Sequence, residues 1–215
     1  MKISIRPANN SVFSCVKNYG VLCFFVTILL FLFFSCTTPP VTSTQEEISY
    51  RMPSLYISDV GIKSAESLVN FFMSEAPASD REKVERLAGL YVDEAELEGI
   101  NADIAFAQMC LETGFLRFGG LVSEDMNNFC GLGAIDENQR GNSFDTEQLG
   151  VRAHIQHLKA YGTDEPLNMP LIDPRYKWVN PKGKAPTVHG LAQTWAADKD
   201  YGIKLEGILS RMAWY

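Results

Sequence analysis

Apolar residues recur at helical spacing in the middle of the chain, and the first such stretch covers residues 79–98. It begins with Ser79 followed three positions later by Glu82, a pair that is typical of a capping box. Gly99 follows the last helical position and predicts the end of the helix. The residues that we expect to form its buried face are Val84, Leu87, Ala88 and Tyr91.

A second helix is predicted from Asn101, a favourable N-cap, to Gly114, which ends it. Its inward face is predicted to hold Ile104, Ala107 and Leu111. Gln108 and Glu112 are four residues apart and therefore share a different face. We expect Glu112 to be a carboxylate at a helix end that faces outside the core.

Two regions between the predicted helices are rich in turn-forming residues. Residues 127–144 contain glycines and asparagines and predict a small hairpin or an irregular loop. Residues 167–186 contain four prolines and predict a long loop of the kind that often borders a binding site.

Helical spacing returns after residue 144. A third helix is predicted to begin at Asp145 or Thr146 and to bury Val151, Ile155 and Leu158. A final pair of helices is predicted over residues 188–195 and 201–212. The pattern as a whole indicates a mainly α domain, in the α+β sense, with a small hairpin or loop lobe.

The N-terminus has a different character from the rest. Three basic residues precede an unbroken apolar run at residues 21–34, which suits the hydrophobic region of an export signal. Ser35 and Cys36 then resemble a loose lipobox, so we expect a lipid on Cys36; an uncleaved N-terminal anchor is the alternative. The predicted organisation is a signal peptide at 1–35, a lipidated tether at 36–60 and one domain at 61–215.

Charge narrows the choice of partner. The chain carries a formal net charge of −7, and the part that begins at Cys36 carries −10, because the preceding segment holds three basic residues and no acid. Binding to nucleic acid depends on clustered Lys and Arg, so this composition argues against it. We expect an exported, monomeric protein that is anchored to a membrane, the outer membrane facing the periplasm being favoured.

Three motifs in a fixed order carry a family resemblance. They are Ala-Phe-Ala-Gln-Met-Cys-Leu-Glu-Thr-Gly at 105–114, Asn-Asn-Phe-Cys-Gly-Leu-Gly at 127–133 and Trp-Ala-Ala-Asp-Lys-Asp-Tyr-Gly at 195–202. Together they resemble the bacterial glucosaminidase family over residues 79–212. The resemblance implies a lysozyme-like helical fold with a glycan groove. It also implies cleavage of the β-1,4 bond after N-acetylglucosamine in peptidoglycan, with no cofactor.

The resemblance assigns the general acid to Glu112. A sugar alkoxide is a poor leaving group and needs a proton as its bond breaks, which a carboxylic acid can supply. The second catalytic group is open: Asp136 and Glu137 are the acids of the shortened hairpin region, and the substrate's own acetamido group is the alternative. Tyr201 matches a family tyrosine and is a candidate for stabilising charge near the reaction centre.

Several residues are candidates for contact with the sugars. Aromatic rings can stack on pyranose faces, although such rings more often fill the core. Asparagine amides can bind acetamido groups or only shape a turn. The candidate substrate-binding residues are Gln108, Asn127, Asn128, Phe129, Trp178 and Trp195.

Rival functions remain open from the sequence alone. His154, His157 and His189 raise the possibility of a zinc amidase or peptidase, but no H-E-x-x-H pattern accompanies them, so we expect no metal site. Cys110 and Cys130 are a possible disulfide pair or two buried thiols. A muramidase, a lytic transglycosylase or a glycan-binding lipoprotein without activity are further alternatives.

Overall fold

The computed structural model describes residues 50–215, so the signal segment, Cys36 and most of the predicted tether lie outside the described residues. This part of the chain is mainly helical, as predicted. Its α-helices are α1 (Ala65–Glu75), α2 (Arg81–Glu98), α3 (Ala102–Thr113), α4 (Glu147–Gly162) and α5 (Tyr201–Met212). Short 3₁₀ turns occur at Glu124–Met126, Tyr176–Trp178 and Val188–Leu191. None of the helices between residues 50 and 215 combines the length and the apolar character of a membrane-spanning segment.

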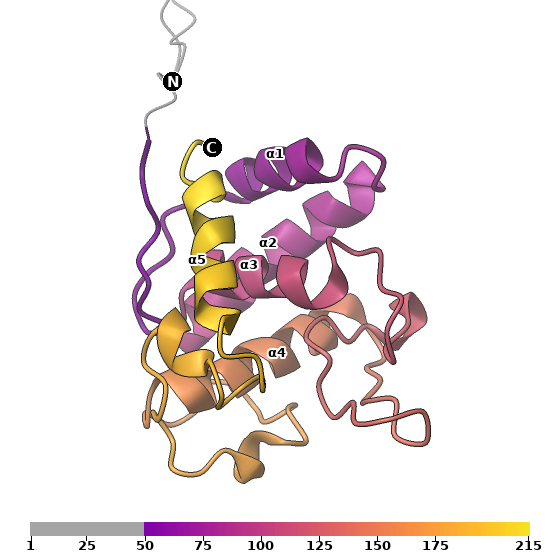
Figure 1. The fold of residues 1–215 in the computed structure, drawn as a ribbon, viewed down its shortest axis with the longest axis vertical. Coiled ribbons are helices and arrows are strands. Elements are labelled where there is room, and N and C mark those ends of the chain that lie inside the picture. Colours follow the sequence, from indigo (N-terminus) through magenta and orange to yellow (C-terminus); the bar gives the residue numbers. More distant parts are fainter. Residues whose placement is uncertain (1–49) are drawn as a thin grey trace, which may run out of the picture. The chain divides into compact units, whose positions relative to one another are not determined.

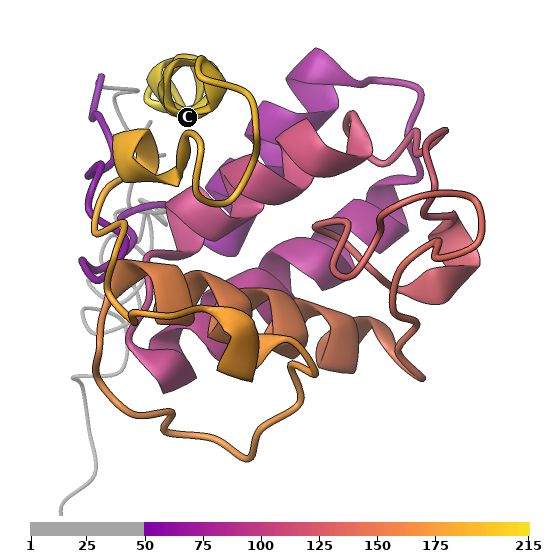
Figure 2. The ribbon, with the colours of Figure 1, turned by 60° about the horizontal axis from the view of Figure 1, so that its bottom comes forward.

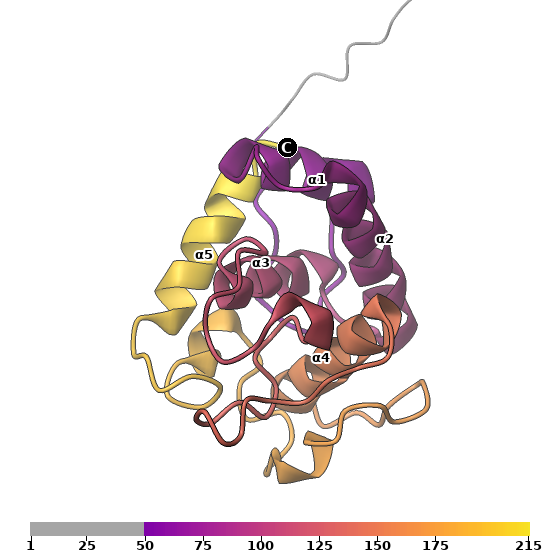
Figure 3. The same ribbon diagram turned by 90° about the vertical axis from the view of Figure 1, so that its right-hand side faces the viewer.

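Helix α3 is the centre of the domain. It contacts α1, α2, α4 and α5 (Figures 1 and 2), and every position from Ala102 to Cys110 is buried. Figure 3 shows α5 and α2 on opposite sides of α3, and α1 at the top of the view above all three. In the last turn Leu111 is partly exposed and Glu112 is exposed, so the C-terminal end of α3 is where this central helix meets solvent.

The ends of the central helices follow the capping residues in the sequence. Asn101 accepts hydrogen bonds from the backbone N–H groups of Asp103 and Ile104, and Gly114 ends α3 in the left-handed conformation that glycine adopts without strain. Helix α2 begins one residue later than expected, because the carboxylate of Asp80, and not Ser79, caps its first turn. The predicted capping box at Ser79 is therefore wrong, whereas the predicted N-cap of α3 is confirmed. Helix α4 begins at Glu147, directly after the predicted start at Asp145 or Thr146, and Thr146 caps it.

Two helix predictions need correction. Helix α1 was not predicted, although Ser64 caps it and it buries Leu68, Val69, Phe71 and Phe72. The predicted helix at 188–195 is only a 3₁₀ turn of four residues. Its continuation is blocked because Ala192 is extended and Gln193 adopts a positive φ of 60°.

The folded unit begins earlier than the expected boundary at residue 61. The backbone N–H of Arg51 donates to Ala213 O at 2.9 Å, and that of Ile57 donates to Pro186 O at 2.9 Å. The Ile57 side chain is fully buried. These hydrogen bonds attach residues 51–57 to the C-terminal part of the domain (Figure 1). Residues 51–57 are therefore part of the folded unit and not of a free tether.

The proline-rich loop after α4 is held by buried side chains. The Glu98 carboxylate accepts hydrogen bonds from the backbone N–H groups of Asn168 and Met169, and it pairs with Lys159 at 3.0 Å. Gln156 Oε1 accepts from the N–H groups of Ile172 and Asp173. Helices α2 and α4 thus fix the path of this loop and carry its later residues to the end of α3.

Candidate active site

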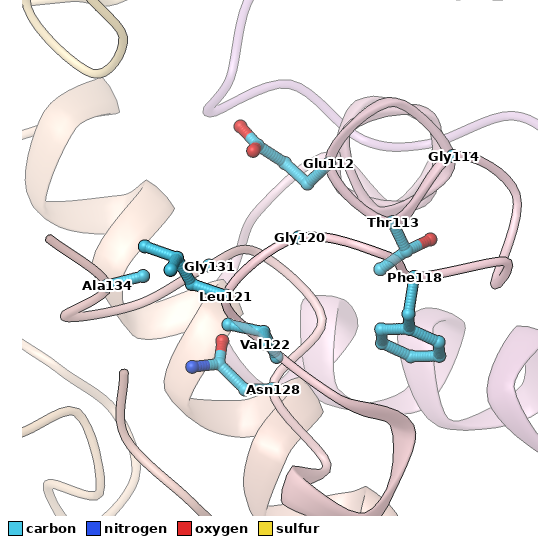
Figure 4. A pocket seen from close by; sticks show the side chains of 10 residues that line it. All are labelled: Glu112, Thr113, Gly114, Phe118, Gly120, Leu121, Val122, Asn128, Gly131 and Ala134. Carbon is cyan, nitrogen blue, oxygen red and sulfur yellow. The ribbon is translucent and has the colours of Figure 1, made fainter. Parts of the chain in front are cut away.

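Glu112 lies in the last turn of α3, between two hollows. The first has a volume of about 220 Å³ and is lined by Glu112, Thr113, Gly114, Phe118, Gly120, Leu121, Val122, Asn128, Gly131 and Ala134 (Figure 4). The second has a volume of about 370 Å³ and is lined by Glu112, Cys130, Gly131, Leu132, Gly133, Ala134, His157, Tyr161, Arg175, Trp195 and Ala196. Both share Glu112, Gly131 and Ala134, so the two hollows adjoin at Glu112 and together form one cleft.

The two oxygens of the Glu112 carboxylate differ in their surroundings. Oε1 accepts a hydrogen bond from the indole Nε1 of Trp195 at 3.0 Å and another from the hydroxyl of Tyr201. Oε2 accepts no hydrogen bond from any residue between 50 and 215. One oxygen is therefore fixed by the protein, while the other is free to hold a proton toward the cleft.

The protein around the cleft raises the pKa of Glu112. Solvent reaches the side chain, but the surrounding protein removes part of its hydration, and this desolvation raises the pKa of Glu112 above its ordinary value. The hydrogen bonds from Tyr201 and Trp195 oppose the rise without cancelling it. A carboxyl group with a raised pKa retains its proton closer to neutral pH, as a general acid must.

A chain of buried hydrogen bonds extends from Tyr201 into the core. Gln108 Nε2 donates to the Tyr201 hydroxyl oxygen at 2.8 Å. Gln108 Oε1 is 3.0 Å from His154 Nε2, and His154 Nδ1 is 2.8 Å from the hydroxyl of Tyr91. Burial lowers the pKa of His154 to about 3, so its imidazole is neutral and carries one N–H.

The direction of the hydrogen bonds in this chain follows from the contact between Tyr201 and Glu112. Tyr201 donates to the Glu112 carboxylate, so its oxygen must accept from Gln108, which places the Gln108 amide oxygen next to His154. His154 then donates from Nε2, and its Nδ1 accepts from Tyr91. Every donor in the chain therefore points toward Glu112.

Three of the expected substrate-binding residues are almost fully buried. Gln108 and Phe129 are fully buried, so the expectation that they contact sugars is wrong: Gln108 supports Tyr201 and Phe129 fills the core. The amide of Asn128 is also buried and donates to Leu132 O and Asn142 O, both at 2.9 Å. Asn128 thus shapes the loop that forms the floor of the first hollow.

The other candidates have mixed positions. Asn127 Nδ2 donates to Phe144 O at 2.9 Å and closes the 127–144 loop. Trp195 is half-buried, lines the second hollow and packs on Tyr161 and His157, with ring centroids 5.2 and 5.0 Å away. Trp178 is 67% exposed, but it lines neither hollow.

The two acids of the expected hairpin are not in the cleft. Asp136 and Glu137 line neither hollow, and Asp136 accepts hydrogen bonds from the backbone of Asn138 and Gln139 in its own turn. The segment forms only an isolated bridge between Asp136 and Gln139. Among the residues that the structure describes, Glu112 is the one carboxylate that lines either hollow.

The histidines and cysteines occupy separate environments. His154 is in the buried chain, His157 Nδ1 is 2.7 Å from Asp173 Oδ2, and His189 is 3.4 Å from Glu206. Within residues 50–215, no three His, Cys, Asp or Glu side chains are grouped as metal ligands are. Cys110 and Cys130 are buried free thiols whose pKa values are raised by burial, which disfavours the thiolate.

Comparison with known proteins agrees with this site. Residues 88–213 match the glucosaminidase family, described as mannosyl-glycoprotein endo-beta-N-acetylglucosaminidase. The chain belongs to the glucosaminidase family. It is also 43% identical over 155 residues to an uncharacterized protein of Borreliella burgdorferi (strain ATCC 35210 / DSM 4680 / CIP 102532 / B31), an alignment that covers 72% of this chain and 76% of the relative. No solved structure matches the chain significantly.

Family membership makes this chain a glycoside hydrolase by class, with a glycan as its substrate. The matched region contains the whole Glu112 cleft of this glucosaminidase domain. Sequence reasoning missed the parts of the cleft that have no motif, namely Tyr161 and Arg175. Their spacing in the sequence carries no signal, because the fold alone brings them to the cleft.

Proposed function

We propose that this protein is an endo-β-N-acetylglucosaminidase of the cell envelope that cleaves the β-1,4 bond after N-acetylglucosamine in peptidoglycan. The observation that supports this best is the position of Glu112, which lies between two hollows of one cleft with one carboxylate oxygen unoccupied. A glycan strand laid along the cleft has one sugar in each hollow. The bond between these sugars then crosses Glu112.

In this proposal Glu112 is the general acid. Its free oxygen donates a proton to the glycosidic oxygen as the C–O bond breaks, and the leaving sugar departs as a neutral alcohol. Trp195 and Tyr201 hold the other oxygen and then stabilise the carboxylate that remains after proton transfer. The same carboxylate can afterwards remove a proton from the incoming water.

The nucleophile, in our proposal, is the carbonyl oxygen of the substrate's own 2-acetamido group. It attacks the anomeric carbon while the glycosidic bond breaks, and it forms a cyclic oxazolinium that water opens in the second step. Two successive inversions retain the β configuration at the anomeric carbon. Asp136 and Glu137, the expected carboxylates, lie outside both hollows, which favours this route.

The reaction is tested with purified sacculi and the full-length chain in mild detergent. We expect new reducing ends on N-acetylglucosamine and a loss of about 10²- to 10⁴-fold in turnover for Glu112→Gln, with an unchanged circular dichroism spectrum. Reducing N-acetylmuramic acid would instead indicate a muramidase, and a 1,6-anhydro end a lytic transglycosylase. Binding without any release would indicate a glycan-binding protein.

Stereochemistry tests the nucleophile separately. Proton NMR recorded during early turnover should show the β anomer of the new reducing end before mutarotation. The α anomer as first product would exclude the acetamido route and would require a water that is activated on the opposite face.

The cellular setting is also a proposal. The basic N-terminal segment, the apolar run at 21–34 and the Ser35–Cys36 pair support export and a lipid anchor at Cys36. Metabolic labelling with a fatty acid analogue tests this, because a Cys36→Ser variant should lose the label. Fractionation of the labelled protein then distinguishes the inner from the outer membrane.

A further inference from the structure

The basic residues of the domain are unevenly distributed. Residues 50–215 contain 16 Lys and Arg and 24 Asp and Glu, so the described part is acidic. Residues 174–184 nevertheless contain four basic side chains and no acid: Arg175, Lys177, Lys182 and Lys184. An acidic protein that keeps one short segment free of acids has a local site where negative charge is attracted.

This basic segment borders the catalytic cleft. Arg175 lines the same hollow as Glu112, His157 and Tyr161. Lys184 Nζ lies 4.7 Å from the ring centroid of Tyr161, on the wall of this hollow. Two of the four positive charges of the segment, those of Arg175 and Lys184, therefore lie at one of the two hollows.

Arg175 is positioned within the hollow but is not neutralised there. Its backbone N–H donates to Asp173 Oδ1 at 2.8 Å, and its side-chain stem packs at Gly133, where an added Cβ would lie 3.5 Å from Arg175 Cδ. The guanidinium forms no ion pair or hydrogen bond with any residue from 50 to 215. Asp173, the nearest acid in sequence, is buried and pairs with His157.

A guanidinium with all five donors available in a concave site is suited to a carboxylate, which it can bind in a bidentate manner. In peptidoglycan, the lactyl group of N-acetylmuramic acid is joined by an amide bond to a peptide that bears carboxylates, and removal of the peptide leaves a free lactyl carboxylate. Chitin-type glycans have the same β-1,4 backbone without any carboxylate. A cationic residue beside Glu112 can therefore distinguish the two polymers.

We propose that Arg175, with the basic segment 174–184 around it, is a carboxylate-binding subsite that recognises the acidic substituent of N-acetylmuramic acid. The subsite rests on the function proposed above and specifies its substrate. It places a substituted sugar in the second hollow, beside Trp195 and Tyr161. Its role is selectivity for peptidoglycan and not bond cleavage itself.

The test compares three substrates with the full-length chain and its variants. Sacculi carry peptide carboxylates, peptide-free glycan strands carry only lactyl carboxylates, and chitooligosaccharides carry none. Arg175→Gln should lower kcat/KM for sacculi roughly tenfold through KM, as expected for the loss of a charge-assisted hydrogen bond. It should leave turnover of chitooligosaccharides unchanged. Arg81→Gln is the matched control, because Arg81 pairs with Glu85 on α2 and lines neither hollow of the cleft.

The pattern of losses identifies the ligand. A loss on sacculi alone assigns the subsite to the peptide carboxylates. A loss on both charged substrates shows that the subsite also accepts the lactyl carboxylate, which is free only in the peptide-free strands. An equal loss on the neutral oligosaccharide, or a loss as large in Arg81→Gln, would overturn the proposal. Release of reducing ends from sacculi by the unmutated chain reports on the proposed function in the same assay, so the two failures are distinguishable.

Discussion

The Gln108 amide donates to the hydroxyl oxygen of Tyr201 at 2.8 Å, and this contact determines where the Tyr201 proton points. Because the oxygen already accepts from Gln108, the hydroxyl hydrogen is directed to the Glu112 carboxylate. Burial raises the pKa of Tyr201 well above its ordinary value, so the phenol stays protonated and remains a donor. A buried glutamine thus controls the environment of the exposed acid four residues away.

Tyr201→Phe should shift the pH dependence of the reaction. Tyr201 stabilises the charged form of Glu112, so removing the hydroxyl lets the pKa of Glu112 rise further. The acid must be protonated to act, and the rate therefore falls as pH rises through this pKa. We expect the basic limb of the kcat profile to move to higher pH.

The profile of Trp195→Phe provides an independent check of that shift. The Trp195→Phe substitution also removes one hydrogen-bond donor to Glu112 Oε1, so the basic limb of its kcat profile should move in the same direction. Glu112→Gln should show no such limb in its residual activity. A Tyr201→Phe profile identical to that of the unmutated chain would contradict the assigned hydrogen bond.

His154 should make the domain less stable in mild acid. Its pKa is about 3 in the folded protein and near 6.5 when unfolded. Between these values the unfolded chain binds the extra proton, so stability falls as pH decreases from about 6.5 toward 3. The contribution of one such group is roughly 1 kcal/mol per pH unit within that window.

Urea unfolding at pH 7 and pH 5 measures this contribution when the chain is compared with His154→Gln. The variant should be less stable at pH 7, because it disturbs the bonds to Tyr91 and Gln108. Its stability should also change less between the two pH values. Parallel pH dependences in both proteins would show that His154 is not the titrating group.

Close packing at Gly150 supports the floor of the cleft. A Cβ added to Gly150 in α4 would lie 1.8 Å from the carbonyl oxygen of Asn127. Gly150→Ala must therefore push the 127–144 loop away, and we expect a loss of about 2 kcal/mol in stability together with reduced turnover. Gly89→Ala in α2 is the control, because nothing lies within 4 Å of its added Cβ. That change should stabilise the protein by roughly 0.5 to 1 kcal/mol.

Local signals in the sequence predicted the helices that surround Glu112. Asn101, Gly99, Gly114 and Thr146 act through their own backbone and neighbours, so their roles are visible without tertiary structure. The position of Glu112 at the exposed end of the central helix follows from the same signals. The face of Gln108 was wrongly predicted, because α3 is surrounded by other helices and has no free polar side.

The parts of the site that depend on long-range contacts could not be predicted. Arg175 reaches the cleft because Glu98 and Gln156 hold the loop that precedes it, and Glu98 and Asn168 are 70 residues apart in the sequence. Tyr91 was expected in the core, but its hydroxyl is also the first donor of the chain toward Glu112. Such long-range contacts produce no periodic pattern of residues in the sequence.

The buried Glu98 carboxylate contributes to the stability of the domain and also holds the loop that leads to the basic segment. Burial alone would raise the pKa of Glu98, but hydrogen bonds from Asn168 N–H, Lys159 and Gln156 outweigh it and lower the pKa overall. Glu98→Gln removes the charge that these donors require and leaves Lys159 buried without its partner. Breaking a buried ion pair in this way should cost roughly 3 kcal/mol of stability, measured by urea unfolding at pH 7.

The same substitution should loosen the loop that carries Arg175. Amide hydrogen exchange at Asn168 and Met169 should accelerate, because their N–H groups lose the carboxylate that accepts from them. Glu96→Gln, an exposed position on the same helix, should change neither quantity. If the Arg175 subsite depends on the hydrogen bonds from Asn168 and Met169 to Glu98, Glu98→Gln raises KM for sacculi and leaves the chitooligosaccharide rate unchanged. Both rates are measured below the unfolding temperature of the variant. Faster exchange with an unaltered KM would show that Arg175 is positioned by Asp173 and Gly133 alone.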